Sequence, residues 1–212
     1  MGNRFAEIAF TPSVRAVQKS MGSNKHYDRT REGDPYNEEL GPNEVDFIAL
    51  RDTFYMASVS ETGWPYVQHR GGPPGFIKVL DSTTLGFADY RGNRQYVSVG
   101  NVLKDDRVAL ILVDYPNRMR LKLLGHARIV STDETDLLSE LDVPGYRARV
   151  ERGFVIKIAA YDWNCPQHIT PRYTQAEIES VVGSLKERLA ELEAALQECR
   201  SNRAGHPART AS

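Results

Sequence analysis

The feature that most constrains the fold is a succession of short apolar segments between residues 53 and 163, separated by turn residues. Seven of them have the β-branched or alternating composition of strands: 53–60, 65–69, 76–80, 84–89, 107–113, 119–130 and 153–163. Two helix-like segments, 93–106 and 133–141, interrupt the series. Parallel strands would need a crossover, usually a helix, after nearly every strand. The sequence therefore predicts a mainly β fold with flanking helices, a closed antiparallel barrel of Greek-key type.

The N-terminal part of the chain shows helix signals and then a polar loop. Thr11 is suited to cap a helix that Pro12 begins, and Gly22 is suited to end it. After the loop, Asn43 and Asp46 indicate the start of a short helix. We therefore expect an N-terminal helix and loop over 1–42 and a barrel domain over 43–165.

The C-terminal part has a different periodicity. Thr174 and Glu177 form a capping-box pattern. Apolar residues then recur at alternating steps of four and three, which is a heptad seam: Ile178, Val182, Leu185, Leu189, Leu192 and Leu196. Packing on the chain's own barrel and pairing with a second chain both remain open. We expect a helical extension over 166–200 and a disordered tail over 201–212.

Composition limits the partners of the protein. The 212 residues carry a formal net charge of -1, so the chain as a whole has no attraction for nucleic acid or for a membrane. No apolar stretch is long enough to span a bilayer, and no N-terminal segment resembles a signal peptide. The two cysteines, Cys165 and Cys199, suggest no disulfide framework. These features predict a soluble protein of the cytoplasm.

One turn, in the stretch FADYRGNRQY (87–96), concentrates positive charge. Arg91 and Arg94 lie on either side of Gly92-Asn93, where a predicted strand ends and a predicted helix begins. A helix N-terminus offers free N–H groups, and guanidinium groups match phosphate oxygens. This turn predicts a pocket for one phosphate. A surface turn with two solvated arginines is the alternative.

A second polar cluster lies upstream, in QHRGGPPGFIK (68–78). A predicted strand carries His69 and Arg70, a Gly-Gly-Pro-Pro-Gly loop follows, and the next strand carries Lys78. The prolines stiffen this loop, and the glycines would let a flat ligand lie against the backbone. A solvated strand face is the alternative interpretation.

The order of these segments resembles a known family. PYVQHR, FIK, LGFADYRGNRQY, DDRVALILV and RLKLLGHARIV follow one another as in the pyridoxamine 5'-phosphate oxidase-like flavoproteins, the FMN-binding split barrels. The resemblance covers about residues 45–165. It implies a split β-barrel homodimer with FMN at the subunit interface. It also implies an oxidoreductase that transfers a hydride or electrons through flavin N5 from a small-molecule substrate. A non-catalytic flavin or haem carrier and a deazaflavin-dependent reductase are alternatives on the same fold.

The resemblance also implies a set of cofactor-binding residues. Arg94 would bind the phosphate together with Arg91 and Asn93. Gln95 stands where these oxidases usually have a lysine, so Arg91 would replace that charge. The remaining members would lie along the ribityl chain and the ring: Ala88, Asp89, Tyr90, His69, Arg70, Lys78, Arg120 and Trp163.

The chain departs from the oxidases after its last predicted strand. It lacks their terminal segment with Arg and His that grips the substrate phosphate, so the resemblance does not extend to vitamin B6 oxidation. A substrate pocket would instead use His168, Arg172 or Tyr173. Cys165 and His168 have ligand-like spacing, yet a structural zinc site needs four ligands. We therefore expect no metal site, and we expect Cys165 to be a small packed residue rather than a nucleophile.

Overall fold

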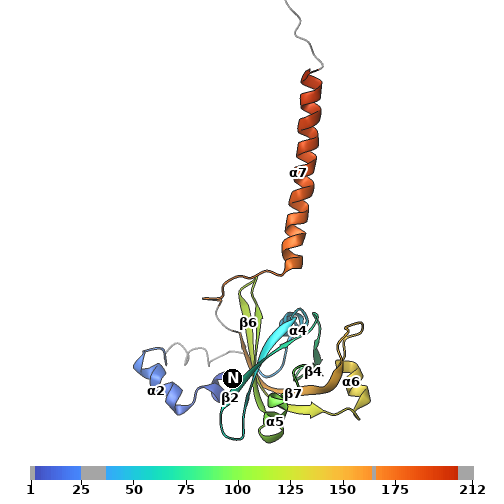
Figure 1. Ribbon diagram of the computed structural model, residues 1–212. Helices are drawn as coiled ribbons and strands as arrows, with labels where there is room; N and C mark the ends of the chain where they lie inside the picture. The colour runs from blue at the N-terminus through green and yellow to red at the C-terminus, as the bar shows by residue number, and fades with distance from the viewer. Residues whose placement is uncertain (1–2, 25–36, 164–165, 205–212) are drawn as a thin grey trace, which may run out of the picture. The chain divides into compact units, whose positions relative to one another are not determined.

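A computed structural model describes residues 3–24, 37–163 and 166–204, which form two compact units, one ending at Ile169 and one beginning at Thr170 (Figure 1). The helices of the first unit are α1 (Arg4–Ala9), α2 (Pro12–Ser20), α4 (Pro42–Ala49), α5 (Val97–Lys104) and α6 (Thr135–Leu141). Its strands are β1 (Thr53–Val59), β2 (Pro65–Gly71), β3 (Ile77–Asp81), β4 (Thr84–Tyr90), β5 (Arg107–Asp114), β6 (Met119–Val130) and β7 (Val150–Trp163). The second unit contains α7 (Gln175–Ala204).

The seven strands form one antiparallel sheet in the order β2-β1-β5-β6-β7-β4-β3. The hairpins β1-β2 and β3-β4 flank a central meander of β5, β6 and β7. Flat, such a sheet would be about 29 Å wide. The two edge strands are nevertheless consecutive in sequence, and the residues between Gly71 and Ile77 reach at most about 20 Å. The sheet must therefore curl, and β2 faces β3 across a split. The split β-barrel fold inferred from the sequence is confirmed.

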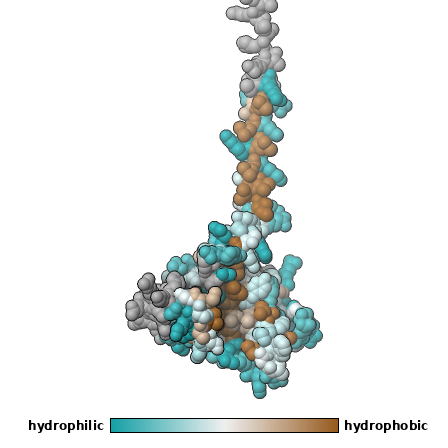
Figure 2. All heavy atoms as spheres, turned by 90° about the vertical axis from the view of Figure 1, so that its left-hand side faces the viewer, coloured by the Kyte–Doolittle hydropathy of each residue, from teal (hydrophilic) through white to brown (hydrophobic). Residues whose placement is uncertain are grey.

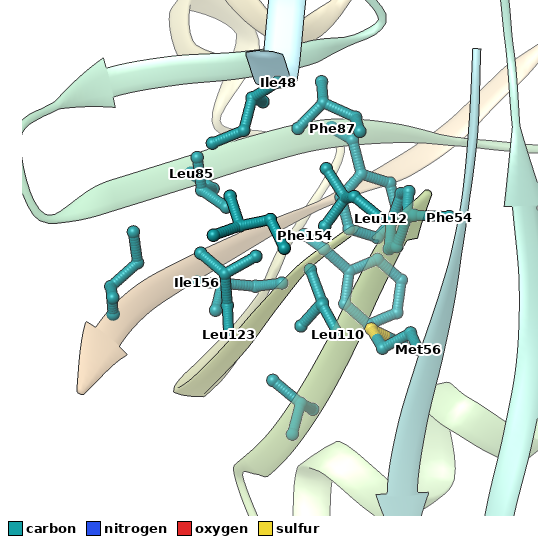
Figure 3. Close-up of a cluster of buried hydrophobic side chains, with 14 of the residues drawn as sticks. Ile48, Phe54, Met56, Leu85, Phe87, Leu110, Leu112, Leu123, Phe154 and Ile156 are labelled. Atoms are coloured by element: carbon teal, nitrogen blue, oxygen red, sulfur yellow. The ribbon is translucent and has the colours of Figure 1, made fainter. Parts of the chain in front are cut away.

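Aromatic and aliphatic side chains from both hairpins fill the barrel. Figure 3 shows these residues pointing toward one another from β1, β4, β5, β6 and β7. The Phe87 ring stacks on Phe154 at 5.1 Å and meets Phe54 edge-on at 5.1 Å. All three are at most 2% exposed. Because β1 and β4 belong to different hairpins, this cluster holds the two halves of the barrel together.

Helix α6 packs on the barrel mainly through Leu141, which fits against two glycines. Leu141 is fully buried, and a Cβ added to Gly86 of β4 would lie 2.3 Å from its Cδ2 atom. A Cβ at Gly153 of β7 would lie 2.6 Å from its Cδ1 atom. The two glycines therefore form the socket that receives Leu141.

The structure confirms the predicted strands and corrects the predicted starts of two helices, α4 and α5. Helix α2 begins after Thr11, whose Oγ1 accepts a hydrogen bond from the Val14 amide at 3.4 Å. Helix α1 was not predicted. The predicted Asn43–Asp46 cap of α4 is wrong, because Gly41 is the N-cap and its amide donates to Glu44 Oε2 at 2.9 Å. Helix α5 begins at 97 rather than 93.

Helix α7 agrees with the predicted heptad helix. The Thr174 amide donates to Glu177 Oε2 at 2.7 Å, and the Glu177 amide donates to Thr174 Oγ1 at 3.3 Å, which completes the capping box. The helix extends to Ala204, beyond the predicted end at 200. Residues 205–212 of the predicted tail lie outside the described residues. No helix in the described part of the chain is long and apolar enough to cross a membrane.

Leu141→Ala should lower the free energy of unfolding by about 2–5 kcal/mol, because it empties a socket that the neighbouring glycines cannot fill. Urea denaturation measures the change. Leu103→Ala on α5 is the control, since Leu103 is 74% exposed and should change stability by less than about 0.5 kcal/mol. Equal effects of the two substitutions would contradict this packing.

Candidate functional site

A polar pocket of about 210 Å³ opens where the ends of β2 and β4 meet the start of β7. The turn between β4 and α5 forms one wall, and the first turn of α5 forms another. The side chains and backbone that line it come from these elements: Gln68, Arg70, Asp89, Tyr90, Gly92, Asn93, Arg94, Tyr96, Ser98, Val99 and Glu151.

An ion pair across the split forms the floor of this pocket. Arg70 of β2 pairs through Nη1 with Asp89 of β4, and both side chains are about one-tenth exposed. The guanidinium lies 5.0 Å above the Phe154 ring, so its position is fixed from below. Arg152 Nε lies 3.5 Å from the other oxygen of Asp89. Burial raises the pKa of Asp89, and Arg70 and Arg152 oppose that rise.

The turn after β4 has an uncommon backbone. Arg94 and Tyr96 have φ angles of 62° and 55°, in the left-handed region that a right-handed helix excludes. This conformation explains why α5 begins at Val97 and not at 93. Asn93 Oδ1 accepts a hydrogen bond from the Gln95 amide at 3.2 Å, which closes the turn locally. The result is a loop that holds the Arg94 side chain at the pocket wall.

Tyr96 and Glu151 connect this turn to β7. Arg94 Nε donates to Tyr96 Oη at 3.0 Å, and this contact raises the pKa of the Arg94 guanidinium. Tyr96 Oη in turn donates to Glu151 Oε2 at 3.1 Å. Glu151 also faces Arg91 Nε at 3.6 Å and Arg152 Nη2 at 3.1 Å. Its carboxylate is therefore an internal anion that holds the cationic side chains of the site in place.

The N-terminus of α5 is fixed against the barrel by two hydrogen bonds. Ser98 Oγ donates to Gln68 Oε1 of β2 at 2.7 Å, and Asn101 Nδ2 donates to Ser58 Oγ of β1 at 3.0 Å. Ser98 and Asn101 are buried. Because Ser98 and Val99 line the pocket, the first turn of α5 contributes its partial positive charge there.

Two residues of the pocket wall carry a buried polar atom without a hydrogen-bond partner among the described residues, Arg70 Nε and Tyr90 Oη, and the Tyr90 side chain packs in the cluster around α6. Burial raises the pKa of Tyr90 to about 12, so its hydroxyl stays protonated and able to donate. The Tyr146 ring packs against Tyr90 edge-on at 5.0 Å. Buried donors of this kind usually have a partner in the working protein, such as a ligand or an ordered water.

The structure brings together five of the predicted site residues at the pocket: Arg94, Asn93, Asp89, Tyr90 and Arg70. Arg91 lies next to the pocket, where its Nε is 3.6 Å from Oε1 of the wall residue Glu151. Gln95 follows in the same turn, but its side chain is not part of the pocket wall.

The other predicted residues lie elsewhere in the subunit. His69 points away from the pocket, because side chains alternate along β2, and it contacts Thr53 and Tyr55 instead. Ala88 is buried behind β4 in the cluster around α6. Trp163 donates through Nε1 to Glu44 Oε1 at 2.6 Å. Lys78 on β3 and Arg120 on β6 are also outside the pocket wall. A role of these five residues in cofactor binding stays a prediction.

Sequence reasoning missed several residues of the site: Tyr96, Ser98, Val99, Glu151 and Arg152. Glu151 and Arg152 belong to β7, which begins at Val150, before the predicted strand at 153. The pairing of Asp89 with Arg152 brings them to the turn. One available signal was the alternation of side chains along β2, which puts Gln68 and Arg70 on one face and His69 on the other.

The sequence predicts no metal site at Cys165 and His168, and the surroundings of Cys165 lie outside the described residues. Within the described part of the chain, no three His, Cys, Asp or Glu side chains come together as a metal-binding group. His168 is an exposed residue with a φ angle of 63°.

Residues 40–153, more than half of the chain, match the family model described as pyridoxamine 5'-phosphate oxidase. The chain belongs to the pyridoxamine 5'-phosphate oxidase family. The matched region contains both hairpins and the turn with Arg94. It ends at the start of β7, so α7 is outside it. A search of curated protein sequences found no significant match.

Solved structures resemble the first unit at low identity. A putative pyridoxamine 5'-phosphate oxidase from Lactobacillus delbrueckii is 19% identical, with a TM-score of 0.45, covering 59% of this chain and 94% of that one. HupZ from Group A Streptococcus is 13% identical, with a TM-score of 0.45 and coverages of 63% and 99%. An FMN-binding protein from Syntrophomonas wolfei is 9% identical, with a TM-score of 0.43 and coverages of 72% and 95%. The family assignment depends on the family model.

Arg70→Met should lower the free energy of unfolding by about 3 kcal/mol, because it leaves the buried Asp89 carboxylate without its main partner. The double variant Arg70→Met with Asp89→Asn should lose at least about 1 kcal/mol less than the sum of the two single variants. Chemical denaturation of all four proteins measures this coupling.

Arg128→Met is the control, since Arg128 pairs with Glu134 at 2.9 Å on the exposed surface. It should cost less than about 1 kcal/mol. Strictly additive effects at Arg70 and Asp89 would contradict a buried pair that joins the two sides of the split.

Proposed function

We propose that this protein binds FMN at the pocket and acts as an FMN-dependent oxidoreductase. The observation that carries the proposal is the joint position of Arg94, Asn93 and the first turn of α5 around one cavity. One buried donor of a wall residue, Arg70 Nε, has no hydrogen-bond partner among the described residues. In a member of the pyridoxamine 5'-phosphate oxidase family, these groups suit a phosphate and the polar chain attached to it.

The charge around the pocket fits a phosphate dianion. Four arginines and two acids lie in the pocket wall or in ion pairs with wall residues: Arg70, Arg91, Arg94, Arg152, Asp89 and Glu151. With the acids ionised, two positive charges are left unbalanced, which matches the charge of the FMN phosphate. The global charge of -1 does not provide this attraction, so the local cluster must.

The size of the pocket supports a second subunit at the site. A volume of about 210 Å³ is below the range of about 300–1,000 Å³ that encloses a drug-sized ligand. We infer that the phosphate end of FMN is bound in one subunit and that a second copy covers part of the ring.

An apolar hollow on the outer face of the sheet suits this contact. Residues of β1, β2, β5 and β6 line it, among them Tyr55, Ala57, Val67 and Ile111. Val67 is 61% exposed in the single chain. Exposed apolar surface of this kind is typical of a homodimer interface.

In this proposal the residues of the chain bind and orient, and bound FMN supplies hydride or electron transfer at its ring. Arg94, Asn93 and the amide groups of α5 hold the phosphate. The Arg70–Asp89 pair fixes β2 relative to β4 and would give the ribityl chain a rigid floor. No nucleophile from the protein is required, because the cofactor carries the chemistry.

Arg94→Ala should weaken FMN binding at least about ten-fold, because it removes a charge-assisted contact to the phosphate. Riboflavin, which has no phosphate, should bind both proteins equally. Flavin fluorescence titration of the refolded apoprotein measures both affinities.

Arg118→Ala is a matched control for Arg94→Ala. Arg118 is also an exposed arginine at a turn, with a φ angle of 54°, so its substitution changes the same side chain in the same backbone conformation. It should leave FMN affinity unchanged. If Arg94→Ala keeps wild-type affinity for FMN, the phosphate is not bound at this turn.

Glu151→Gln should raise FMN affinity several-fold, because the carboxylate competes with the phosphate for Tyr96 and the neighbouring arginines. The same titration measures it, with Glu134→Gln as the control at an exposed ion pair. A weaker affinity in Glu151→Gln would show that the carboxylate supports the bound state instead of competing with it.

A further inference from the structure

Helix α7 carries a continuous apolar seam. Six side chains recur along it at steps of four and three residues, and all are between 37% and 63% exposed: Ile178, Val182, Leu185, Leu189, Leu192 and Leu196. Figure 2 shows apolar side chains gathered along this helix. A helix of 30 residues is about 45 Å long. Most of the stability of such a helix comes from packing of its apolar face, so the seam requires an occupant.

The spacing of the seam identifies the geometry that covers it. A strict period of seven residues keeps the apolar side chains facing a second helix in a left-handed coiled coil. Val182, Leu189 and Leu196 take the a positions, and Ile178, Leu185 and Leu192 take the d positions. The four central layers would contain leucine from both helices.

The charged residues beside the seam distinguish between the two orientations of a helix pair. The e positions, next to the d residues, carry Glu179, Lys186, Glu193 and Arg200. In an antiparallel pair, e positions face e positions of the second helix. With Leu189 against the partner's Leu192, Lys186 faces the partner's Glu193. In the same register, Glu179 faces the partner's Arg200. Each contact occurs twice, so four pairs of opposite charge form.

A parallel pair uses these charges less well. There, each g position faces the e position five residues further along the second helix. The g positions carry Val181, Arg188 and Ala195, so Arg188 opposite the partner's Glu193 is the one match of opposite charges, formed twice. Arg188 already forms an ion pair with Glu191 of its own helix at 2.7 Å.

We propose that α7 pairs with α7 of a second copy of this chain as an antiparallel coiled coil. The seam and the charge pattern carry the inference, and it does not depend on the flavin site. Helix α7 is then an assembly element formed by a different part of the chain from the barrel. A protein that also dimerises through its barrel would use α7 to strengthen or extend that assembly.

Sedimentation equilibrium of the full-length protein over a wide concentration range tests the pairing. Leu189→Glu places a charge at the centre of the seam and should weaken association at least about 100-fold. Ala194→Glu adds the same charge on the outer side of α7 and should leave association unchanged. Near-UV circular dichroism checks that the barrel stays folded in both variants. An association constant that Leu189→Glu does not change would overturn the proposal, because α7 would then have another occupant or none.

A charge exchange tests the orientation. Lys186→Glu and Glu193→Lys should each weaken association about ten-fold, and the double variant should return to within about three-fold of the wild type. Lys186 and Glu193 are seven residues apart in one helix, too far for an intrahelical pair, so the recovery must arise between copies. Recovery in Arg188→Glu with Glu193→Arg, without recovery in the first pair, would show a parallel coiled coil and overturn the antiparallel arrangement.

Discussion

The structure of the first unit depends on one buried ion pair, Arg70 with Asp89, that joins the two sides of the split in the barrel. Hydrogen bonds between strands run continuously from β2 through the meander to β3, but β2 and β3 do not pair with each other. Arg70 connects β2 to β4 directly and lies on the aromatic core at Phe154. A pair in this position costs desolvation energy, and it determines where the two hairpins stand relative to each other. The pocket depends on this fixed position of β2 relative to β4.

The rest of the site follows from this arrangement. With β2 and β4 held together, the turn after β4 lies over the start of β7, and Glu151 reaches Tyr96 and the arginines beside it. The left-handed backbone at Arg94 and Tyr96 delays the start of α5 to Val97, and Ser98 and Val99 of its first turn line the cavity. A chain with a net charge of -1 thus creates a local cationic site through a few side chains and one helix N-terminus.

The sequence predicted the strands well because each is a short β-branched or alternating segment bounded by turn residues. In β5 the polarity does not alternate, but buried and more exposed residues do. The sequence predicted Arg94 and Asn93 as pocket residues because the signal is local: arginines cluster at one turn between a predicted strand and a predicted helix. It could not place Glu151 and Arg152, because their contact with the turn depends on the β4–β7 register and on an irregularity between Asp89 and Tyr90. It also could not show that His69 faces away from Arg70 without fixing the register of β2. Backbone strain at Tyr96 has no sequence signal, since non-glycine residues seldom adopt it.

The most direct test of this account is the visible absorption spectrum of the freshly purified protein, followed by release of any bound species by heat and addition of FMN to the colourless fraction. The account predicts two flavin absorption bands and a released species that behaves as FMN, or the appearance of those bands when FMN is added. A folded protein that is colourless and whose spectrum is unchanged by FMN would contradict it, and the arginine turn would then serve another phosphate ligand or none.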